Sequence, residues 1–98
     1  MSLYSVAEIQ RIVSPIAAKY GVERMTLFGS YARGDNTPRS DIDFRIDRGS
    51  VRGLQMAFLL TDLEDALGTR VDLLSTSALD ASFLASIQRE EKLLYECR

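Results

Sequence analysis

Two aspartates, Asp41 and Asp43, stand two positions apart in a segment whose apolar residues alternate as they do in a β-strand. Because successive side chains of a strand point to opposite faces, both carboxylates point the same way, with Cα atoms roughly 6.5 to 7 Å apart. At an effective dielectric constant of about 20, two like charges about 6 Å apart repel each other by on the order of 3 kcal/mol. A divalent cation would remove that repulsion, so the pair is a candidate metal site.

A third carboxylate, Asp72, lies between two apolar residues, Val71 and Leu73, in another strand-like segment. Its side chain is expected on the face of the strand that does not pack against the helices, where it could converge with Asp41 and Asp43. The chain has no His and a single Cys, so the available ligands are mainly oxygens. Oxygen ligands favour Mg²⁺, with Mn²⁺ as an alternative, over zinc.

Gly29 and Ser30 follow an apolar run and precede the aspartate pair. A glycine lets the backbone approach a ligand closely, and if Ser30 opens a short helical turn, the N–H groups and hydroxyl of that turn would face an anion. Arg33 lies one turn further along the chain. A triphosphate bound there would have its oxygens beside two metal ions held by the aspartates, which is the arrangement of a two-metal in-line displacement.

Five arginines fall within one twenty-residue window: Arg33, Arg39, Arg45, Arg48 and Arg52. Their forked guanidinium groups could meet a phosphate. Four of them, Arg39, Arg45, Arg48 and Arg52, could instead be solvated surface residues, because exposed ion pairs contribute little to stability. Arg33 is expected to pair with a nearby aspartate such as Asp35.

Helical and strand-like segments alternate around these residues. The first helix is expected over residues 5–20, where Ser5 and Glu8 form a capping-box pattern and Gly21 ends the helix. Because a proline inside a helix removes one backbone hydrogen bond, Pro15 predicts either a kink or two short helices that meet there.

The remaining patterns predict strands over 24–28 and 40–47, a helix over 51–67, a strand over 70–75, a helix over about 77–88 and a short fourth strand over 92–96. This order predicts an α/β (α+β) fold with a small mixed sheet of three to four strands and helices packed on one face. The length predicts one domain, residues 1–98. Consecutive apolar residues at 56–60 indicate either a helix wedged between the sheet and the first helix or an exposed patch for a partner.

The composition excludes several classes of protein. A formal net charge of −2 argues against general nucleic-acid binding, which depends on many basic residues that neutralise phosphates. No run approaches the roughly 18 apolar residues of a membrane helix, and the first residues lack the pattern of an export signal. The single Cys97 cannot form an internal disulfide. We therefore expect a cytoplasmic protein that does not bind membranes.

The stretch GSYARGDNTPRSDIDFRI, with Gly-Ser at 29–30 and Asp-Ile-Asp at 41–43, is followed by a third acidic residue in a later strand. This pattern resembles the polymerase-beta-like nucleotidyltransferases, and in particular their minimal nucleotidyltransferase (MNT) group. The resemblance implies a nucleotidyltransferase fold. It also implies transfer of a nucleoside monophosphate from a triphosphate to an acceptor hydroxyl, with release of pyrophosphate.

The resemblance further implies a role for each matching residue. Gly29 and Ser30 would hold the phosphates, and Arg33 and Ser40 match the motif as further nucleotide contacts. The metal-binding and catalytic residues would be three aspartates: Asp41 and Asp43, which would carry the metals, and Asp72, which would bind the catalytic metal and help to deprotonate the acceptor.

Many small MNT proteins resemble antitoxins that silence a HEPN-domain ribonuclease by adding AMP to one of its tyrosines. The resemblance therefore implies ATP as substrate, two Mg²⁺ ions and a HEPN toxin as partner. One alternative is a non-catalytic antitoxin that neutralises its toxin by binding. Another is a nucleotidyltransferase that acts on a small molecule or on RNA.

Overall fold

The computed structural model describes residues 4–97, and its elements alternate between helix and strand. In chain order they are α1 (Val6–Tyr20), β1 (Arg24–Phe28), α2 (Ser30–Arg33), β2 (Ile42–Asp47), α3 (Gln55–Leu67), β3 (Val71–Ser75), the 3₁₀ helix η1 (Thr76–Ala78), α4 (Ala81–Gln88) and β4 (Lys92–Glu96). The strands form one sheet in the order β3-β2-β1-β4. Strands β2 and β3 are parallel and the other neighbours are antiparallel, so the expected mixed sheet is confirmed.

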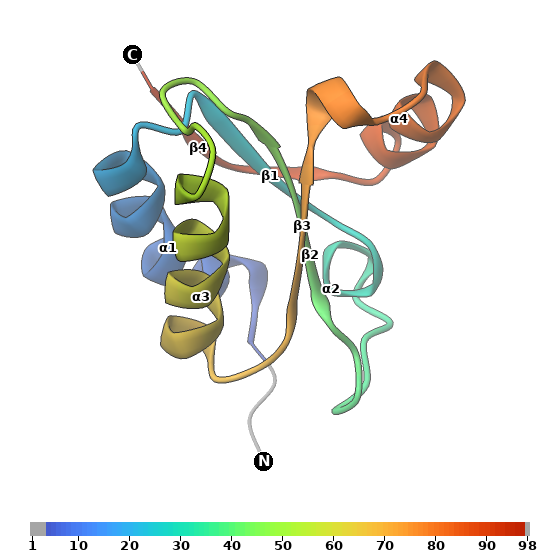
Figure 1. Ribbon diagram of the computed structural model, residues 1–98. Helices are drawn as coiled ribbons and strands as arrows, with labels where there is room; N and C mark the ends of the chain where they lie inside the picture. The colour runs from blue at the N-terminus through green and yellow to red at the C-terminus, as the bar shows by residue number, and fades with distance from the viewer. Residues whose placement is uncertain (1–3, 98) are drawn as a thin grey trace.

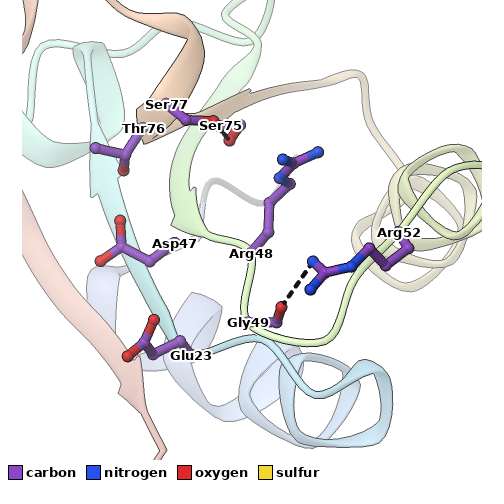
Figure 2. A pocket seen from close by; sticks show the side chains of 8 residues that line it. All are labelled: Glu23, Asp47, Arg48, Gly49, Arg52, Ser75, Thr76 and Ser77. Atoms are coloured by element: carbon purple, nitrogen blue, oxygen red, sulfur yellow. Dashed lines mark hydrogen bonds between the residues drawn. The ribbon is translucent and has the colours of Figure 1, made fainter.

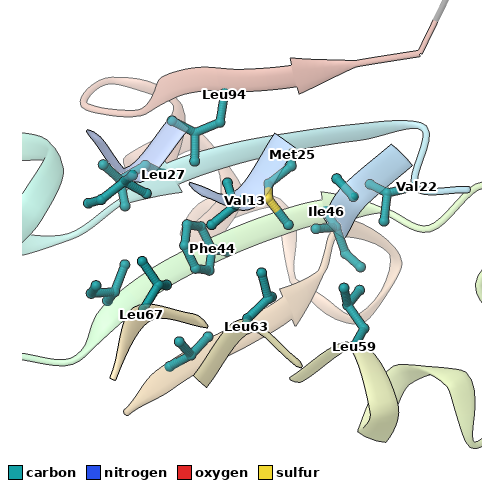
Figure 3. Packing of buried hydrophobic residues seen from close by; sticks show 14 of the residues in the cluster. Val13, Val22, Met25, Leu27, Phe44, Ile46, Leu59, Leu63, Leu67 and Leu94 are labelled. Atoms are coloured by element: carbon teal, nitrogen blue, oxygen red, sulfur yellow. The ribbon is translucent and has the colours of Figure 1, made fainter. Parts of the chain in front are cut away.

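Two long helices, α1 and α3, lie side by side on one face of the sheet (Figure 1). The alternation in β2 points Ile42, Phe44 and Ile46 toward these helices, and all three are fully buried. Figure 3 shows Phe44 and Ile46 packed against leucines of α3 and Val13 of α1. The opposite face carries the polar side chains of β2 and is therefore the face available for chemistry.

Helix α4 belongs to that second face rather than to the first. Its Phe83 packs edge-on against Phe28 at the end of β1, with ring centroids 6.4 Å apart and an interplanar angle of 89°. Phe28 lies directly across from Asp43 in the β1–β2 ladder, so the two side chains share one face. Helix α4 thus covers part of the polar face and leaves the rest open (Figure 1).

The first helix ends as its sequence predicts but is not divided at Pro15. Ser5 and Glu8 form the expected capping box, and Gly21 closes the helix in the left-handed conformation at φ 74°. One continuous helix runs through Pro15, which is exposed, while Val13 and Ala17 on either side are buried in the core. Packing on both sides of the proline therefore holds the helix together despite the missing backbone hydrogen bond.

Two other helices differ from the predicted bounds because backbone turns interrupt the pattern. Helix α3 begins four residues later than expected, since Gly53 takes up a left-handed conformation at φ 53° just before it. The helix expected over 77–88 is two elements, because Leu79 is extended and Asp80 caps α4 by accepting from the Phe83 N–H at 2.8 Å. The predicted fourth strand is confirmed as β4 on the edge of the sheet beside β1.

Candidate active site

The polar face of the sheet carries the three predicted aspartates at one end of strands β2 and β3. Asp43 and Asp72 are directly paired in the parallel β2–β3 ladder, and Asp41 lies immediately before β2. Asp72 is exposed, whereas Val71 beside it is buried in the core, so the Asp72 side chain is turned away from the apolar interior. Strand pairing thus brings carboxylates from two separate segments of the chain onto one surface.

The pKa of Asp43 reflects the neighbouring negative charges on this surface. The pKa of the Asp43 carboxyl is raised to about 6, mainly by its partial burial and also by the negative charges of Asp72 and Asp41. The nearby Arg33 guanidinium opposes this effect without cancelling it. A carboxyl under such repulsion is a group whose charged form a cation would stabilise.

The aspartates are not already gathered around a single point. Asp41 Oδ1 lies 3.4 Å from Arg70 Nε, and within residues 4–97 no group of three candidate ligands is arranged to hold a metal ion. The donor chemistry nevertheless fits Mg²⁺, because all three ligands are carboxylates and Asp43 and Asp72 face the same way. Freeing Asp41 would cost little, since the Arg70 side chain is 84% exposed and such pairs are weak.

Gly29 lies against the Asp43 carboxylate in a conformation that other residues rarely adopt. Its φ of 77° and ψ of −155° put the backbone in a region used almost only by glycine. A Cβ at this position would come within 3.0 Å of Asp43 Cγ. The turn after β1 can therefore pack directly beside the acidic surface only because residue 29 has no side chain.

The short helical turn considered for Ser30 is present as α2. The carbonyl of Gly29 accepts the N–H groups of Ala32 and Arg33, both at 3.0 Å, while Tyr31 and Ala32 are buried and fix the turn to the protein. The N–H groups of Ser30 and Tyr31 have no acceptor among the described residues. They are free donors at the start of a helical turn that adjoins Asp43.

Arg33 is held by two carboxylates. Its Nε donates to Asp35 at 3.1 Å, as the sequence predicts, and its Nη1 donates to both oxygens of Glu90 at 3.2 Å. Both contacts raise the pKa of Arg33, the Asp35 hydrogen bond more than that of Glu90. Glu90 was not predicted from the sequence, and it also accepts the Gly29 N–H at 2.7 Å. Only the pairing of β4 with β1 brings it there.

Over residues 10–98 the sequence matches the family described as Polymerase beta, Nucleotidyltransferase. The chain belongs to this family. The protein is therefore a nucleotidyltransferase, and the resemblance seen in its sequence is confirmed.

Individual relatives of this nucleotidyltransferase agree with the family assignment. MntA, a protein adenylyltransferase of Thermococcus cleftensis, is 32% identical over 95 residues, which cover 92% of this chain and 96% of that protein. A solved structure provisionally described as a minimal nucleotidyltransferase is 30% identical with a TM-score of 0.78, covering 94% of this chain and 98% of the other.

A further structural neighbour shares the fold at lower identity. It is a chain from the complex of a tri-AMPylated Shewanella oneidensis HEPN toxin with an MNT antitoxin. This chain is 18% identical with a TM-score of 0.72, and the match covers 94% of the nucleotidyltransferase and 73% of the neighbour.

Two residues predicted near the nucleotidyltransferase site have local structural contacts. Ser40 Oγ accepts the N–H of Thr37 at 2.9 Å and so closes the turn that leads into β2. For Arg45, the alternative of a solvated surface residue is wrong. Its side chain is only 6% exposed and forms a two-pronged ion pair with Glu91, at 3.0 Å from Nε and 2.6 Å from Nη2.

The five-arginine window does not form one phosphate-binding surface. Arg48 and Arg52 line a separate cavity of about 380 Å³ beyond the other end of β2, together with Glu23, Asp47 and hydroxyls of residues 75–77 (Figure 2). Arg52 is partly engaged there, since its Nη1 donates to the Gly49 carbonyl at 3.2 Å. Of the window, Arg33 alone contacts the glycine turn beside the aspartates, through their shared partner Glu90.

Among residues 4–97, no helix has both the length and the apolar character needed to cross a bilayer.

Proposed function

We propose that this nucleotidyltransferase transfers AMP from ATP to a hydroxyl group of a partner HEPN toxin and thereby acts as an antitoxin, with residues 1–98 forming one catalytic domain. The observation that carries the proposal is the pairing of Asp43 with Asp72 on the face where the Gly29 turn packs against Asp43. The adenylyltransferase name of the Thermococcus relative and the AMPylated toxin complex support AMP as the transferred group. Since ATP is a cytoplasmic metabolite, the cytoplasm is the proposed location.

The turn at Gly29 and Ser30 would bind the triphosphate. The free N–H groups of Ser30 and Tyr31 and the Ser30 hydroxyl would donate to phosphate oxygens, with the Arg33 guanidinium nearby as a cation. Ser40 would act through the turn that it closes before β2 rather than through a long reach into the site.

The three aspartates would hold two Mg²⁺ ions, or Mn²⁺ in their place. Bound metal would polarise the α-phosphate and stabilise the charge that develops on it during transfer. The acceptor oxygen would form a bond to the α-phosphorus as the α–β phosphoanhydride bond breaks and pyrophosphate leaves. Asp72, which is exposed on its strand, would accept the proton of the acceptor hydroxyl.

An exposed apolar patch on α3 supports a macromolecular partner. Leu54 and Phe58, four positions apart at the start of α3, are 74% and 56% exposed, while Leu59 and Leu63 of the same helix are buried. This favours the partner-patch alternative over a helix wedged on all sides. A toxin bound nearby would present its own acceptor hydroxyl to the site.

The proposal is tested by incubating the purified protein with α-labelled ATP, Mg²⁺ and the toxin encoded beside it. We expect label on the toxin with the wild-type protein and none with Asp43→Asn, provided that both proteins give the same far-UV spectrum. Absence of label with the folded wild-type protein would exclude transfer to this partner.

A non-catalytic antitoxin is the second candidate, and the contact between Asp41 and Arg70 favours it, because it keeps one predicted ligand away from the others. A test of whether variants still protect cells from the toxin distinguishes the catalytic antitoxin from the non-catalytic one. If Asp41→Asn combined with Asp43→Asn protects cells as well as the wild type, neutralisation occurs by binding. Label on an RNA or a small hydroxylated compound instead of the toxin would indicate the third alternative.

A further inference from the structure

Glu90 stands at the junction between α4 and β4 and contacts the proposed phosphate-binding turn twice. Its Oε2 accepts the Gly29 N–H at 2.7 Å, and both of its oxygens accept from Arg33 Nη1 at 3.2 Å. Its side chain is 26% exposed, so the carboxylate is partly shielded from water. Hydrogen bonds to a charged acceptor are stronger than neutral ones, particularly when solvent is partly excluded.

The position of Glu90 follows from the register of the sheet. In the antiparallel pairing of β1 with β4, Leu27 lies opposite Lys92, and two further steps bring Gly29 opposite Glu90. The strands have already ended there, and the Gly29 N–H meets the Glu90 carboxylate instead of a backbone carbonyl. A side chain thus continues the ladder at the point where the backbone must turn away toward α2.

The same carboxylate orients Arg33. With Nε bound to Asp35 and Nη1 bound to Glu90, the Nη2 group is the part of the guanidinium that has no acceptor among the described residues. A planar guanidinium fixed through two of its nitrogens presents the third in a defined direction. The ion pair also offsets the negative charge of Glu90, which would otherwise repel a polyphosphate.

We propose that Glu90 is a positioning residue, which fixes the Gly29 turn and the Arg33 guanidinium in the geometry that receives the triphosphate. This inference rests on the proposed function, since it presumes that ATP binds at that turn. The competing arrangement is that Glu90 occupies the place of a phosphate and has to be displaced by the nucleotide. If Glu90 positions the turn, its replacement weakens nucleotide binding, whereas if Glu90 occupies the place of a phosphate, its replacement tightens binding.

Glu91 provides a matched control because it is the neighbouring residue and carries the same functional group. Its carboxylate pairs with Arg45 and accepts the Thr26 hydroxyl at 2.9 Å, and it makes no hydrogen bond to the glycine turn. Glu91→Gln is therefore expected to lower the melting temperature and to leave nucleotide affinity near the wild-type value. Glu90→Gln is expected to weaken nucleotide binding and to leave the melting temperature near the wild-type value.

The test is calorimetric titration of Mg²⁺ with a non-hydrolysable ATP analogue into the wild type, Glu90→Gln, Glu90→Asp and Glu91→Gln. We expect Glu90→Gln to weaken binding roughly tenfold, as the loss of a charged acceptor shared by two donors would cause. Glu90→Asp is expected to fall in between. The Gly29 amide, followed by ¹H–¹⁵N NMR without nucleotide, should shift upfield in Glu90→Gln and stay unchanged in Glu91→Gln.

Tighter binding by Glu90→Gln would overturn the inference and show that the carboxylate competes with phosphate. Unchanged affinity of Glu90→Gln together with an unmoved Gly29 amide would also overturn it. If the wild type itself binds no analogue, the proposed function fails first, and the NMR shift alone then decides whether Glu90 fixes the turn. Should Glu90→Gln not fold, Glu90→Asp answers the same question, namely whether nucleotide affinity falls or rises relative to the wild type.

Discussion

A Cβ on Gly29 would lie within 3.0 Å of Cγ of Asp43, and closer still to one of its carboxylate oxygens. The turn proposed to bind phosphate and the carboxylate proposed to bind metal are therefore in direct contact. Antiparallel pairing produces this contact, because Phe28 at the end of β1 lies opposite Asp43 in β2. Substitutions at either residue should affect the other.

We predict that Gly29→Ala abolishes nucleotidyl transfer and destabilises the protein by about 2 to 3 kcal/mol, from backbone strain at positive φ combined with the clash at Asp43. Gly68→Ala is the control, because Gly68 also has a positive φ, of 69°, but open space around it. The control should lose only about 1 kcal/mol and retain activity. Urea unfolding and the labelling assay test both variants, and an active Gly29→Ala protein would contradict the proposed close packing.

Because the pKa of Asp43 is raised, we predict that the stability of the metal-free protein depends on pH. This pKa is raised to about 6 by burial and then by Asp72 and Asp41, whereas an aspartate in an unfolded chain titrates near about 3.9. Between these values the folded protein keeps a proton that the unfolded chain releases, so stability falls as the pH rises through the window and stays lower above it. The full difference corresponds to roughly 3 kcal/mol, which solvent screening of this partly exposed group reduces to about 1 kcal/mol.

Asp43→Asn should therefore be more stable than the wild type at pH 7.5 in EDTA, by about 1 kcal/mol, and equally stable near pH 3.5. Denaturant unfolding at several pH values measures this. Asp65→Asn, a change at an exposed position of α3, serves as the control and should show no such dependence. A gain for Asp43→Asn that is the same at both pH values would mean that carboxylate repulsion is not its cause.

Replacing only one partner of the buried ion pair between Arg45 and Glu91 should strongly destabilise the protein. Glu91→Ala would leave a guanidinium that is only 6% exposed without its main partner, and we expect a loss of about 3 kcal/mol. Arg45→Met combined with Glu91→Leu should cost less than Glu91→Ala alone, because no unpaired charge remains. Urea unfolding of Arg45→Met, Glu91→Leu and the double variant gives the coupling free energy, and additive losses would argue against a tightly coupled pair.

Replacing the proline inside α1 should stabilise the protein. Pro15 is exposed within a continuous helix, and Pro15→Ala would restore a backbone donor for the Arg11 carbonyl. After allowance for the greater freedom of the unfolded chain, we expect a gain of about 1 to 2 kcal/mol. Pro38→Ala, in the turn before β2, should give no gain. Thermal unfolding of the two variants compares them directly.

The order of elements could be predicted from the sequence because, in most segments, the spacing of apolar residues agrees with the capping and turn residues at the segment ends. Strand β1 and the end of α1 at Gly21 follow from alternation and a capping glycine. The start of α3 could not be predicted, because a left-handed Gly53 inside an apolar pattern does not reveal its conformation. The placement of Asp43, Asp72 and the Gly29 turn needed only local patterns and the common face of neighbouring strands.

The partners of the arginines could not be predicted, because they depend on the register of an edge strand. Glu90 and Glu91 come from a segment about sixty residues away from Gly29, and nothing local marks them as partners. The register that places Leu27 opposite Lys92 brings Glu90, and not Glu91, opposite the turn. Single-sequence patterns fix the face of a side chain but not the residue across from it.

The edge strand β4 is made after every other part of the site, since residues 92–96 follow all three aspartates and the glycine turn in the chain. A nascent polypeptide that has left the ribosome only as far as β3 already carries the acidic groups, yet its Gly29 amide and Arg33 still lack the carboxylate from residue 90. Competence to take up nucleotide would thus arrive only once β4 has been made and has docked beside β1.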